Sequence, residues 1–243
     1  MKIKLISDIH TEFDRHDSGV NFFNSLPSEG VDLLVVAGDL TTKHYEDNLR
    51  RLCEKFPNVV YVLGNHDYWG RSIQQTHEMM QRIDDKIPNL HWLHNKRIEI
   101  GGKFIAGTTL WFPRCEIYWC WPDFLYVHDG AEGIFQEHDI AYKFLNENVQ
   151  KNDIVVTHHL PSQQCVHPRW EGSKSNCYFV GDAEDIILRK EPSHWFFGHT
   201  HDQRNLQIWK THLLCNPRGY PGEHNECQFD TDIIIDTSLD DKS

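Results

Sequence analysis

The sequence predicts an α/β protein in which a parallel half and an antiparallel half lie side by side, with helices outside. Three observations support this prediction. Apolar runs alternate with helical spacings over residues 2–83, hairpin signals occur in residues 97–106 and 206–215, and short polar clusters come directly after the apolar runs. Because no linker rich in Pro, Gly or Ser interrupts the alternation, we expect residues 1–243 to form a single domain.

The N-terminal part is predicted to form a βαβαβ unit, and therefore a parallel sheet with right-handed crossovers. Continuous apolar runs predict strands at residues 2–6, 31–37 and 59–63, and helical spacing predicts helices at residues 21–26, 45–56 and 71–83. The second of these strands is apolar enough to be buried on both faces. Pro88 closes the last helical stretch, because proline cannot continue a helix.

The C-terminal part contains the two hairpin signals. Gly101 and Gly102 separate strands expected at 97–100 and 103–106, and glycine tolerates the positive φ that such a turn needs. A second hairpin is expected to join residues 206–209 to 212–215. The other elements expected in this part are strands at 153–157, 194–197 and 232–235 and helices at 138–149 and 182–188.

Residues 110–129 form an aromatic segment. Its aromatic side chains are Trp111, Phe112, Tyr118, Trp119, Trp121, Phe124 and Tyr126. They have neither the period of a strand nor that of a helix, so we expect a loop or cap over the site, within the single domain. The alternative is that these side chains fill a second small core, because aromatic-rich runs usually serve packing.

Composition bounds the class of protein. The seven cysteines are scattered and form no Cys-x-x-Cys pair, which argues against a disulfide scaffold and a zinc ribbon. The first apolar stretch is too short for a signal peptide, and none approaches the roughly 20 residues of a membrane span, so we expect a cytoplasmic protein without a membrane partner. The net charge of -12 argues against a broad nucleic-acid surface, although bound cations would let a small anionic substrate approach.

Five polar clusters stand at the ends of strand-like runs. They are Asp8-Ile9-His10, Gly38-Asp39, Gly64-Asn65-His66-Asp67, His158-His159 and Gly198-His199-Thr200-His201. Ligands of open α/β sheets bind beyond the carboxyl ends of the strands, so we expect the five clusters to meet at one sheet edge. Each cluster alone is a weak signal, because the chain has 17 histidines and some pairs arise by chance. Their common position after strands is what indicates an active site.

The residue types in these clusters indicate a two-metal site. Carboxylate, amide and imidazole ligands together suit Mn²⁺, Fe²⁺ and Zn²⁺. Two ions about 3.5 to 4 Å apart need a carboxylate that bridges them, and Asp39 suits that position. The sequence therefore predicts a dinuclear metal centre for phosphoester hydrolysis.

In these clusters the chain resembles the calcineurin-like metallophosphoesterase superfamily, and the segment from Cys215 to Tyr220 resembles a bacterial and phage-type subgroup of small phosphoesterases. The resemblance implies a four-layer αββα sandwich with two mixed central sheets. It also implies two divalent ions, which are Mn, Fe, Zn or Ni, with Mn expected to support activity in vitro. The implied ligands are Asp8, His10, Asp39 and His201 for one ion and Asp39, Asn65, His158 and His199 for the other.

His158 is preferred to His159 as the ligand because it is nearer the end of the strand. His159 is then expected to donate a hydrogen bond behind the site or to contact the substrate. The resemblance further implies that a hydroxide bridging the two ions is the nucleophile, and that His66 stabilises the transition state and protonates the departing oxygen. The alternative for His66 is a purely supporting hydrogen bond.

The chain departs from the protein phosphatases of this superfamily at three positions. Thr42 replaces the aspartate that would orient the catalytic histidine, and Lys43 replaces a phosphate-binding arginine. A phosphoprotein phosphatase is therefore not expected. Asp67 occupies a position where glutamate is frequent, so the carboxylate there is on a slightly shorter side chain.

Two arginines are candidates for gripping a substrate phosphate, because guanidinium offers a planar bidentate fork. Arg218 lies in a turn after a strand, whereas a solvated loop charge is the simpler interpretation of Arg114. The expected function is hydrolysis of phosphodiesters or phosphomonoesters of small molecules or nucleotides. The alternatives are a non-catalytic scaffold of the same fold, which the complete ligand set disfavours, and a nuclease, which the acidic balance disfavours. The sequence specifies no oligomeric state.

Overall fold

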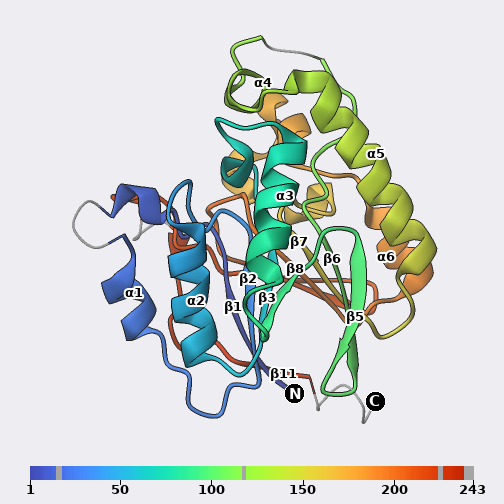
Figure 1. Ribbon diagram of the computed structural model, residues 1–243. Coiled ribbons are helices and arrows are strands. Elements are labelled where there is room, and N and C mark those ends of the chain that lie inside the picture. Colours follow the sequence, from blue (N-terminus) through green and yellow to red (C-terminus); the bar gives the residue numbers. More distant parts are fainter. Residues whose placement is uncertain (15–17, 117–118, 224–226, 238–243) are drawn as a thin grey trace.

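A computed structural model describes residues 1–14, 18–116, 119–223 and 227–237. Two mixed β-sheets pack face to face, and helices cover the outer face of each sheet (Figure 1). This architecture confirms the predicted α/β class with two mixed central sheets. None of the helices among the described residues is both long enough and apolar enough to cross a membrane.

The first sheet has the strand order β11-β1-β2-β3-β4. Its strands are β1 (Lys2–Ile6), β2 (Leu33–Ala37), β3 (Val59–Val62), β4 (Leu90–Trp92) and β11 (Ile235–Asp236). The first four are parallel, and β11 runs antiparallel to β1. The short strand β4 was not predicted, and β11 begins later than the strand expected at 232–235 because only Ile235 and Asp236 pair with β1. Helices α1 (Val20–Ser25), α2 (Tyr45–Lys55) and α3 (Ile73–Asp84) connect these strands.

The second sheet has the strand order β5-β6-β7-β8-β10-β9. Its strands are β5 (Lys96–Ile100), β6 (Lys103–Thr108), β7 (Ile154–Thr157), β8 (His194–Phe197), β9 (Arg204–Ile208) and β10 (Thr211–Cys215). Both predicted hairpins are present, but the prediction of an antiparallel half was wrong, because β6, β7, β8 and β10 are parallel. A hairpin turn fixes only its own pair of strands, and the free edges of β6 and β10 pair with the central strands. The outer face of this sheet is covered by α5 (Gly130–Asn148) and α6 (Glu184–Lys190) (Figure 1).

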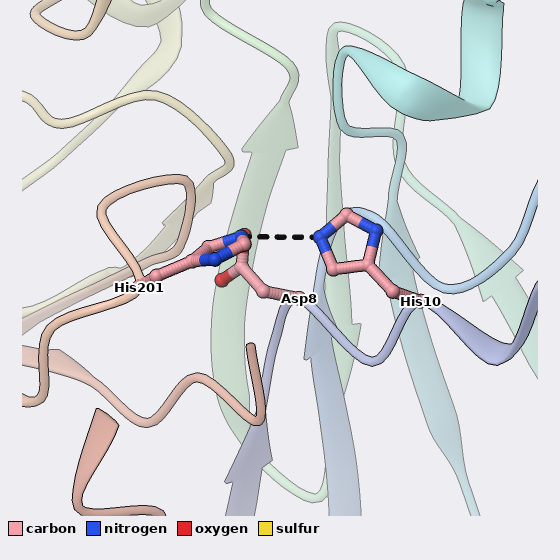
Figure 2. Close-up of side chains that lie close together, drawn as sticks. All are labelled: Asp8, His10 and His201. Carbon is pink, nitrogen blue, oxygen red and sulfur yellow. Dashed lines mark hydrogen bonds and ion pairs between the residues drawn. The ribbon is translucent and has the colours of Figure 1, made fainter. Parts of the chain in front are cut away.

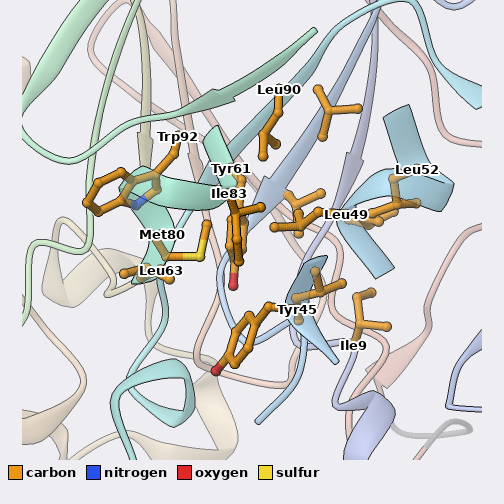
Figure 3. Close-up of a cluster of buried hydrophobic side chains, with 14 of the residues drawn as sticks. Ile9, Tyr45, Leu49, Leu52, Tyr61, Leu63, Met80, Ile83, Leu90 and Trp92 are labelled. Atoms are coloured by element: carbon orange, nitrogen blue, oxygen red, sulfur yellow. The ribbon is translucent and has the colours of Figure 1, made fainter. Parts of the chain in front are cut away.

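Alternation along the central strands explains the layers. Leu33 and Val35 of β2 enter the core between the two sheets, whereas Leu34 and Val36 join the core beneath the helices. Successive side chains of a strand point to opposite faces, so a fully apolar strand serves two cores at once. Figure 3 shows the core beneath the helices, in which Leu49 of α2 and Met80 of α3 lie beside Tyr61 of β3.

Local signals set the start of α3. The Ser72 side chain accepts a hydrogen bond from the backbone N–H of Gln75 at 3.1 Å, and the Gln75 side chain accepts one from the backbone N–H of Ser72 at 3.0 Å. This reciprocal capping satisfies two N–H groups that a helix start leaves unpaired. The helix therefore begins at Ile73, inside the stretch expected at 71–83.

The aromatic segment 110–129 divides into two parts. Trp111 and Phe112 are buried in the core beneath the helices, which agrees with a packing role. Residues 122–126 form a short helix, α4 (Pro122–Tyr126), where a loop was expected, and residues 117–118 lie outside the described residues. Helix α5 begins at Gly130 rather than at His138, because two glycines in its first turns weaken the helical signal without preventing the helix. The remaining short helical turns are η1 (Thr11–Phe13), η2 (His66–Tyr68), η3 (Gln163–Cys165), η4 (Pro168–Trp170) and η5 (Lys174–Tyr178).

Candidate metal centre

The five predicted clusters all lie at the carboxyl ends of β1, β2, β3, β7 and β8, at one edge of the paired sheets. Their backbone is unusual. Asp8, His10, Asp39, His199 and His201 have φ values of 52°, 51°, 54°, 69° and 50°, in the left-handed region that non-glycine residues rarely adopt. Residues held in such conformations are characteristic of functional sites, where surrounding structure compensates the strain. The turns direct each side chain back toward the sheet edge.

Two glycines allow the clusters to approach one another. A Cβ added to Gly38 would lie 2.2 Å from Nδ1 of His158, and one added to Gly64 would lie 2.1 Å from Oδ1 of Asp39. Both distances are below any permitted contact. The Gly-Asp and Gly-Asn pairs in the sequence therefore mark places where the backbone of one loop touches a functional side chain of another.

Asp8, His10 and His201 form the first group of potential metal ligands (Figure 2). The Nε2 atoms of the two histidines lie 3.1 Å apart, and Nε2 of His201 lies 3.5 Å from Oδ1 of Asp8. The other ring nitrogen of each histidine faces a carboxylate, because His10 Nδ1 lies 3.2 Å from Glu12 and His201 Nδ1 lies 2.8 Å from Glu223. A carboxylate at Nδ1 fixes the tautomer whose Nε2 carries a lone pair.

Asp39, His158 and His199 form the second group, and Asn65 adjoins it. Nε2 of His158 lies 3.5 Å from Oδ2 of Asp39, 3.2 Å from Nδ1 of His199 and 3.0 Å from Oδ1 of Asn65. His158 Nδ1 donates to the backbone oxygen of Ala37 at 2.9 Å, so its Nε2 also presents a lone pair.

Asp39 lies where the two groups meet. Its Oδ2 is 3.7 Å from Nε2 of His10 and 3.5 Å from Nε2 of His158. Ligand atoms about 2.1 Å from a tetrahedral ion lie about 3.4 Å apart, so these separations suit ions placed on either side of this oxygen. The geometry therefore brings all seven predicted ligand side chains together, around the carboxylate that was predicted to bridge.

The electrostatics of the centre favour a bound cation. Burial raises the pKa of Asp8 and of Asp39, and Asp67 and Asp8 raise that of Asp39 further. Burial lowers the pKa of His10 to about 3 and that of His158 well below its usual value, which keeps both imidazoles neutral. Although burial opposes it, contact with Glu223 and Asp8 raises the pKa of His201, whose Nε2 lies 3.1 Å from Nε2 of His10. A divalent cation would stabilise the buried carboxylates and could be bound by the neutral imidazoles, so the donor set fits the implied metals.

His66 lies beside the first group and lines the same pocket as Asp39. Its ring stacks on Trp69 with a centroid separation of 3.6 Å, and Nε2 lies 2.9 Å from the Tyr220 hydroxyl. Its Nδ1 lies 3.7 Å from Oε1 of Glu12. His66 is therefore held from three sides, with Nε2 toward the pocket.

Glu12 is a site residue that the sequence reasoning missed. One of its oxygens serves both His10 and His66, and although burial opposes it, contact with these histidines lowers the pKa of Glu12 to about 2. The resemblance to protein phosphatases implies an aspartate at the position of Thr42 that orients a histidine, and here Glu12 is the carboxylate that lies beside His66. The signal for Glu12 in the sequence was its position two residues after the predicted ligand His10.

We expect Glu12→Gln to reduce turnover about 10- to 100-fold, the usual effect of losing a carboxylate that orients a ligand histidine. If Glu12 acts through His66, the loss should be greater for esters with poor leaving groups, and metal content should stay normal. If it acts through His10, metal content should fall instead. Metal analysis and rates on a leaving-group series separate the two. Unchanged rates and metal content would show that Glu12 has no part in the site.

Two further carboxylates position the loops. Oδ2 of Asp67 accepts hydrogen bonds from the backbone N–H groups of Gly64 at 2.7 Å and Asp39 at 3.1 Å, which joins the loops after β2 and β3. Buried Asp123 of α4 accepts from the Asn65 side-chain amide at 2.8 Å, so the Asn65 oxygen faces His158. No local sequence signal identified Asp123, because it lies in the aromatic segment.

The two candidate arginines are both engaged by acidic side chains. The guanidinium of Arg218 contacts Asp14 at 2.7 and 2.9 Å and the backbone oxygen of Ile9 at 3.0 Å, so the structure assigns it to holding the loop after β1 rather than to gripping a phosphate. Arg114 pairs with Glu132 at the surface, as expected of a solvated loop charge. In each case the partner is a carboxylate distant in sequence, which a local pattern does not identify.

His159 is buried and packs against Trp111 and Phe112, while its Nδ1 contacts the backbone oxygen of Thr109 at 3.3 Å. His158 is the member of the pair that joins the ligand group. His159 therefore supports the site from behind.

The burial of His159 predicts acid sensitivity. Burial lowers its pKa to about 3, whereas the unfolded chain has about 6.5. Its contribution to stability is present above pH 6.5 and is lost as the pH falls toward 3, by about 1.4 kcal/mol per pH unit. Between pH 6.5 and 5, the free energy of unfolding of metal-free His159→Phe should fall by about 2 kcal/mol less than that of the metal-free unchanged protein. Urea unfolding at each pH measures this difference. Phenylalanine is a suitable replacement because the Thr109 oxygen keeps its backbone hydrogen bonds. Parallel curves would contradict this expectation.

A pocket of about 350 Å³ opens beside the ligand groups. Asp39, His66 and His199 are among the site residues that line it, and Trp121 and Phe179 contribute aromatic surface. The aromatic segment thus contributes Trp121 to the pocket wall as well as Trp111 to the core.

The fold and this site define a metal-dependent phosphoesterase. A family model for calcineurin-like phosphoesterases matches residues 1–203, and the chain belongs to that family. The fold is similar to that of the phosphopantetheinyl hydrolase from Mycobacterium tuberculosis, with a TM-score of 0.72 and 17% identity over 92% of this chain and 91% of the other. A second solved structure has a TM-score of 0.59 and 15% identity over 90% of each chain. No curated protein sequence matches the chain.

Proposed function

We propose that the protein is a dinuclear metal-dependent phosphoesterase that hydrolyses small phosphoesters, with phosphodiesters included among its substrates. The observation that carries the proposal is the meeting of two ligand groups at one oxygen of Asp39. One group would hold an ion through Asp8, His10 and His201, and the other through Asn65, His158 and His199. Bound divalent ions would supply Lewis acidity and activate water for attack on phosphorus.

The chain's own residues would prepare the reaction. Glu12, Glu223 and the Ala37 carbonyl hold three histidine rings so that their Nε2 atoms converge. Such preorganised groups cost little rearrangement when charge develops in the transition state.

His66 would donate a proton to the departing oxygen. The His66 ring lines the pocket, and the carboxylate of Glu12, 3.7 Å from Nδ1, would hold the ring in place for that transfer. This proton matters most for alkoxide leaving groups, which are poor leaving groups without it. The site could therefore hydrolyse phosphodiesters and alkyl phosphomonoesters.

The pocket supports a small substrate. Its volume of about 350 Å³ lies at the lower end of the range for small-molecule sites. Trp121, Trp170 and Phe179 give it an apolar wall suited to the organic group of an ester, such as a nucleoside. A nuclease is disfavoured by the net charge of -12.

The decisive experiment uses untagged protein stripped of metal and then supplied with Mn²⁺. We expect about two equivalents of metal per chain and Mn²⁺-dependent hydrolysis of bis(p-nitrophenyl) phosphate, p-nitrophenyl phosphate or both. Little bound metal and no gain from Mn²⁺ would instead favour a non-catalytic scaffold. Rapid cleavage of single-stranded oligonucleotides with neither small ester turned over would favour a nuclease.

A further inference from the structure

A second cluster of metal-binding residue types lies away from the sheet edge. His77 of α3, His94 of the link between β4 and β5, and Glu137 of α5 each place one ligand atom within 4.8 Å of the others. Nε2 of His94 lies 3.9 Å from Oε2 of Glu137, and the two imidazole rings are 3.9 Å apart between centroids. Three elements well separated in the sequence thus converge on one point.

The polar groups of this cluster are incompletely satisfied. Nδ1 of His94 is buried without a hydrogen-bond partner among the described residues, while Nε2 of His77 contacts the Tyr68 hydroxyl at 3.1 Å. Burial keeps both imidazoles uncharged by lowering the pKa of His77 to about 4 and that of His94 to about 3. The Glu137 carboxylate therefore has neutral rings beside it where a cation would be favourable.

We propose that His77, His94 and Glu137 bind one Zn²⁺ or a similar borderline divalent ion, at a site separate from the phosphoesterase centre. Two imidazoles and one carboxylate suit such an ion, whereas Mg²⁺ and Ca²⁺ prefer oxygen ligands. Tetrahedral ligands of Zn²⁺ lie about 3.4 Å apart, whereas His94 and Glu137 are 3.9 Å apart and all three ligand atoms lie within 4.8 Å of one another, so binding would draw the side chains closer together. Their side chains are 23% and 16% exposed, which leaves a fourth position for water.

The ion would tie α3, α5 and the β4–β5 link together. Its effect would extend to Tyr68, which contacts His77 and ends the turn that contains His66. The ion would therefore have a structural role, and its ligands are separate from the residues of the phosphoesterase centre.

The test counts bound Zn²⁺ by metal analysis after equilibrium dialysis of untagged, metal-stripped protein. Glu137→Gln and His94→Ala should each bind one equivalent less than the unchanged protein, or bind that equivalent at least about 100-fold more weakly. The rise in melting temperature on adding Zn²⁺ should shrink in the same variants. Glu137→Gln keeps the shape of the side chain, so its result does not depend on whether His94→Ala folds well.

His91→Ala is the matched control, because His91 lies on the neighbouring strand β4 and contacts Asn58 rather than the cluster. It should retain every equivalent of Zn²⁺. An anomalous-scattering map of a Zn²⁺-soaked crystal should show a peak between His77, His94 and Glu137. Equal Zn²⁺ binding by Glu137→Gln and the unchanged protein, or peaks at the sheet edge alone, would overturn the proposal without affecting the phosphoesterase centre.

Discussion

Asp39→Asn is expected to remove both metal ions and to lower kcat/KM by at least about 10³-fold, which corresponds to about 4 kcal/mol of transition-state stabilisation. The reason is its position, because one oxygen of Asp39 lies within 3.7 Å of His10 and 3.5 Å of His158, in the two separate ligand groups. An amide keeps the size of the side chain but loses the charge that both ions would share. Metal analysis and phosphatase assays on the same preparation measure the two effects.

The backbone should tolerate this change. Asp39 has a φ of 54°, and asparagine is one of the few residues that adopt this region readily. Its side-chain oxygen can still accept the backbone N–H of His66, which lies 2.9 Å from Oδ1 of Asp39. Because the substitution removes a buried charge that Asp67 and Asp8 crowd, the metal-free variant should be at least as stable as the metal-free unchanged protein. A lower stability would mean that the activity was lost through misfolding.

Asp32→Asn is the matched control, because Asp32 is exposed at the opposite end of the same strand. It should leave metal content and turnover unchanged. Asp39→Asn protein that retains two equivalents of metal and normal activity would disprove the shared carboxylate.

His66→Ala should leave the metals bound and should lower turnover about 10²- to 10⁴-fold for diesters with alkoxide leaving groups. The loss should be much smaller for p-nitrophenyl esters, whose leaving group needs no proton. The distinction rests on the geometry, because His66 adjoins Asp39 but directs Nε2 toward Tyr220 and the pocket. Rates across a series of leaving groups, with metal content measured in parallel, provide the test.

Tyr220→Phe is the companion variant, since it removes only the hydroxyl that lies 2.9 Å from Nε2 of His66. We expect a smaller loss than in His66→Ala, with a similar dependence on the leaving group. Equal losses for all leaving groups in His66→Ala would show that His66 stabilises charge or holds the loop without donating a proton.

The sequence predicted most of the fold because strand patterns are local. Residues 194–197 form β8 as expected, and Gly101 and Gly102 adopt the positive φ that their hairpin requires. The parallel pairing of β6 with β7 could not be predicted in the same way. It joins strands separated by a long connection, and no turn motif records which edges will meet.

The metal-binding residue types and their places after strands were determined by the sequence, since parallel strands of one sheet bring the loops at their carboxyl ends to one edge. The expectation of a single sheet edge was wrong, because the clusters after β1, β2 and β3 belong to one sheet and those after β7 and β8 to the other, and only the packing of the two sheets joins them. Only the tertiary structure decided which carboxylates serve them. Glu12 reaches His66, Asp123 orients Asn65, and Arg218 is engaged by Asp14 because packing places these distant groups together. Hydrogen bonds and ion pairs form only between groups a few ångströms apart. A sequence pattern predicts local secondary structure, but it does not show which residues distant in the sequence will lie that close in the folded protein.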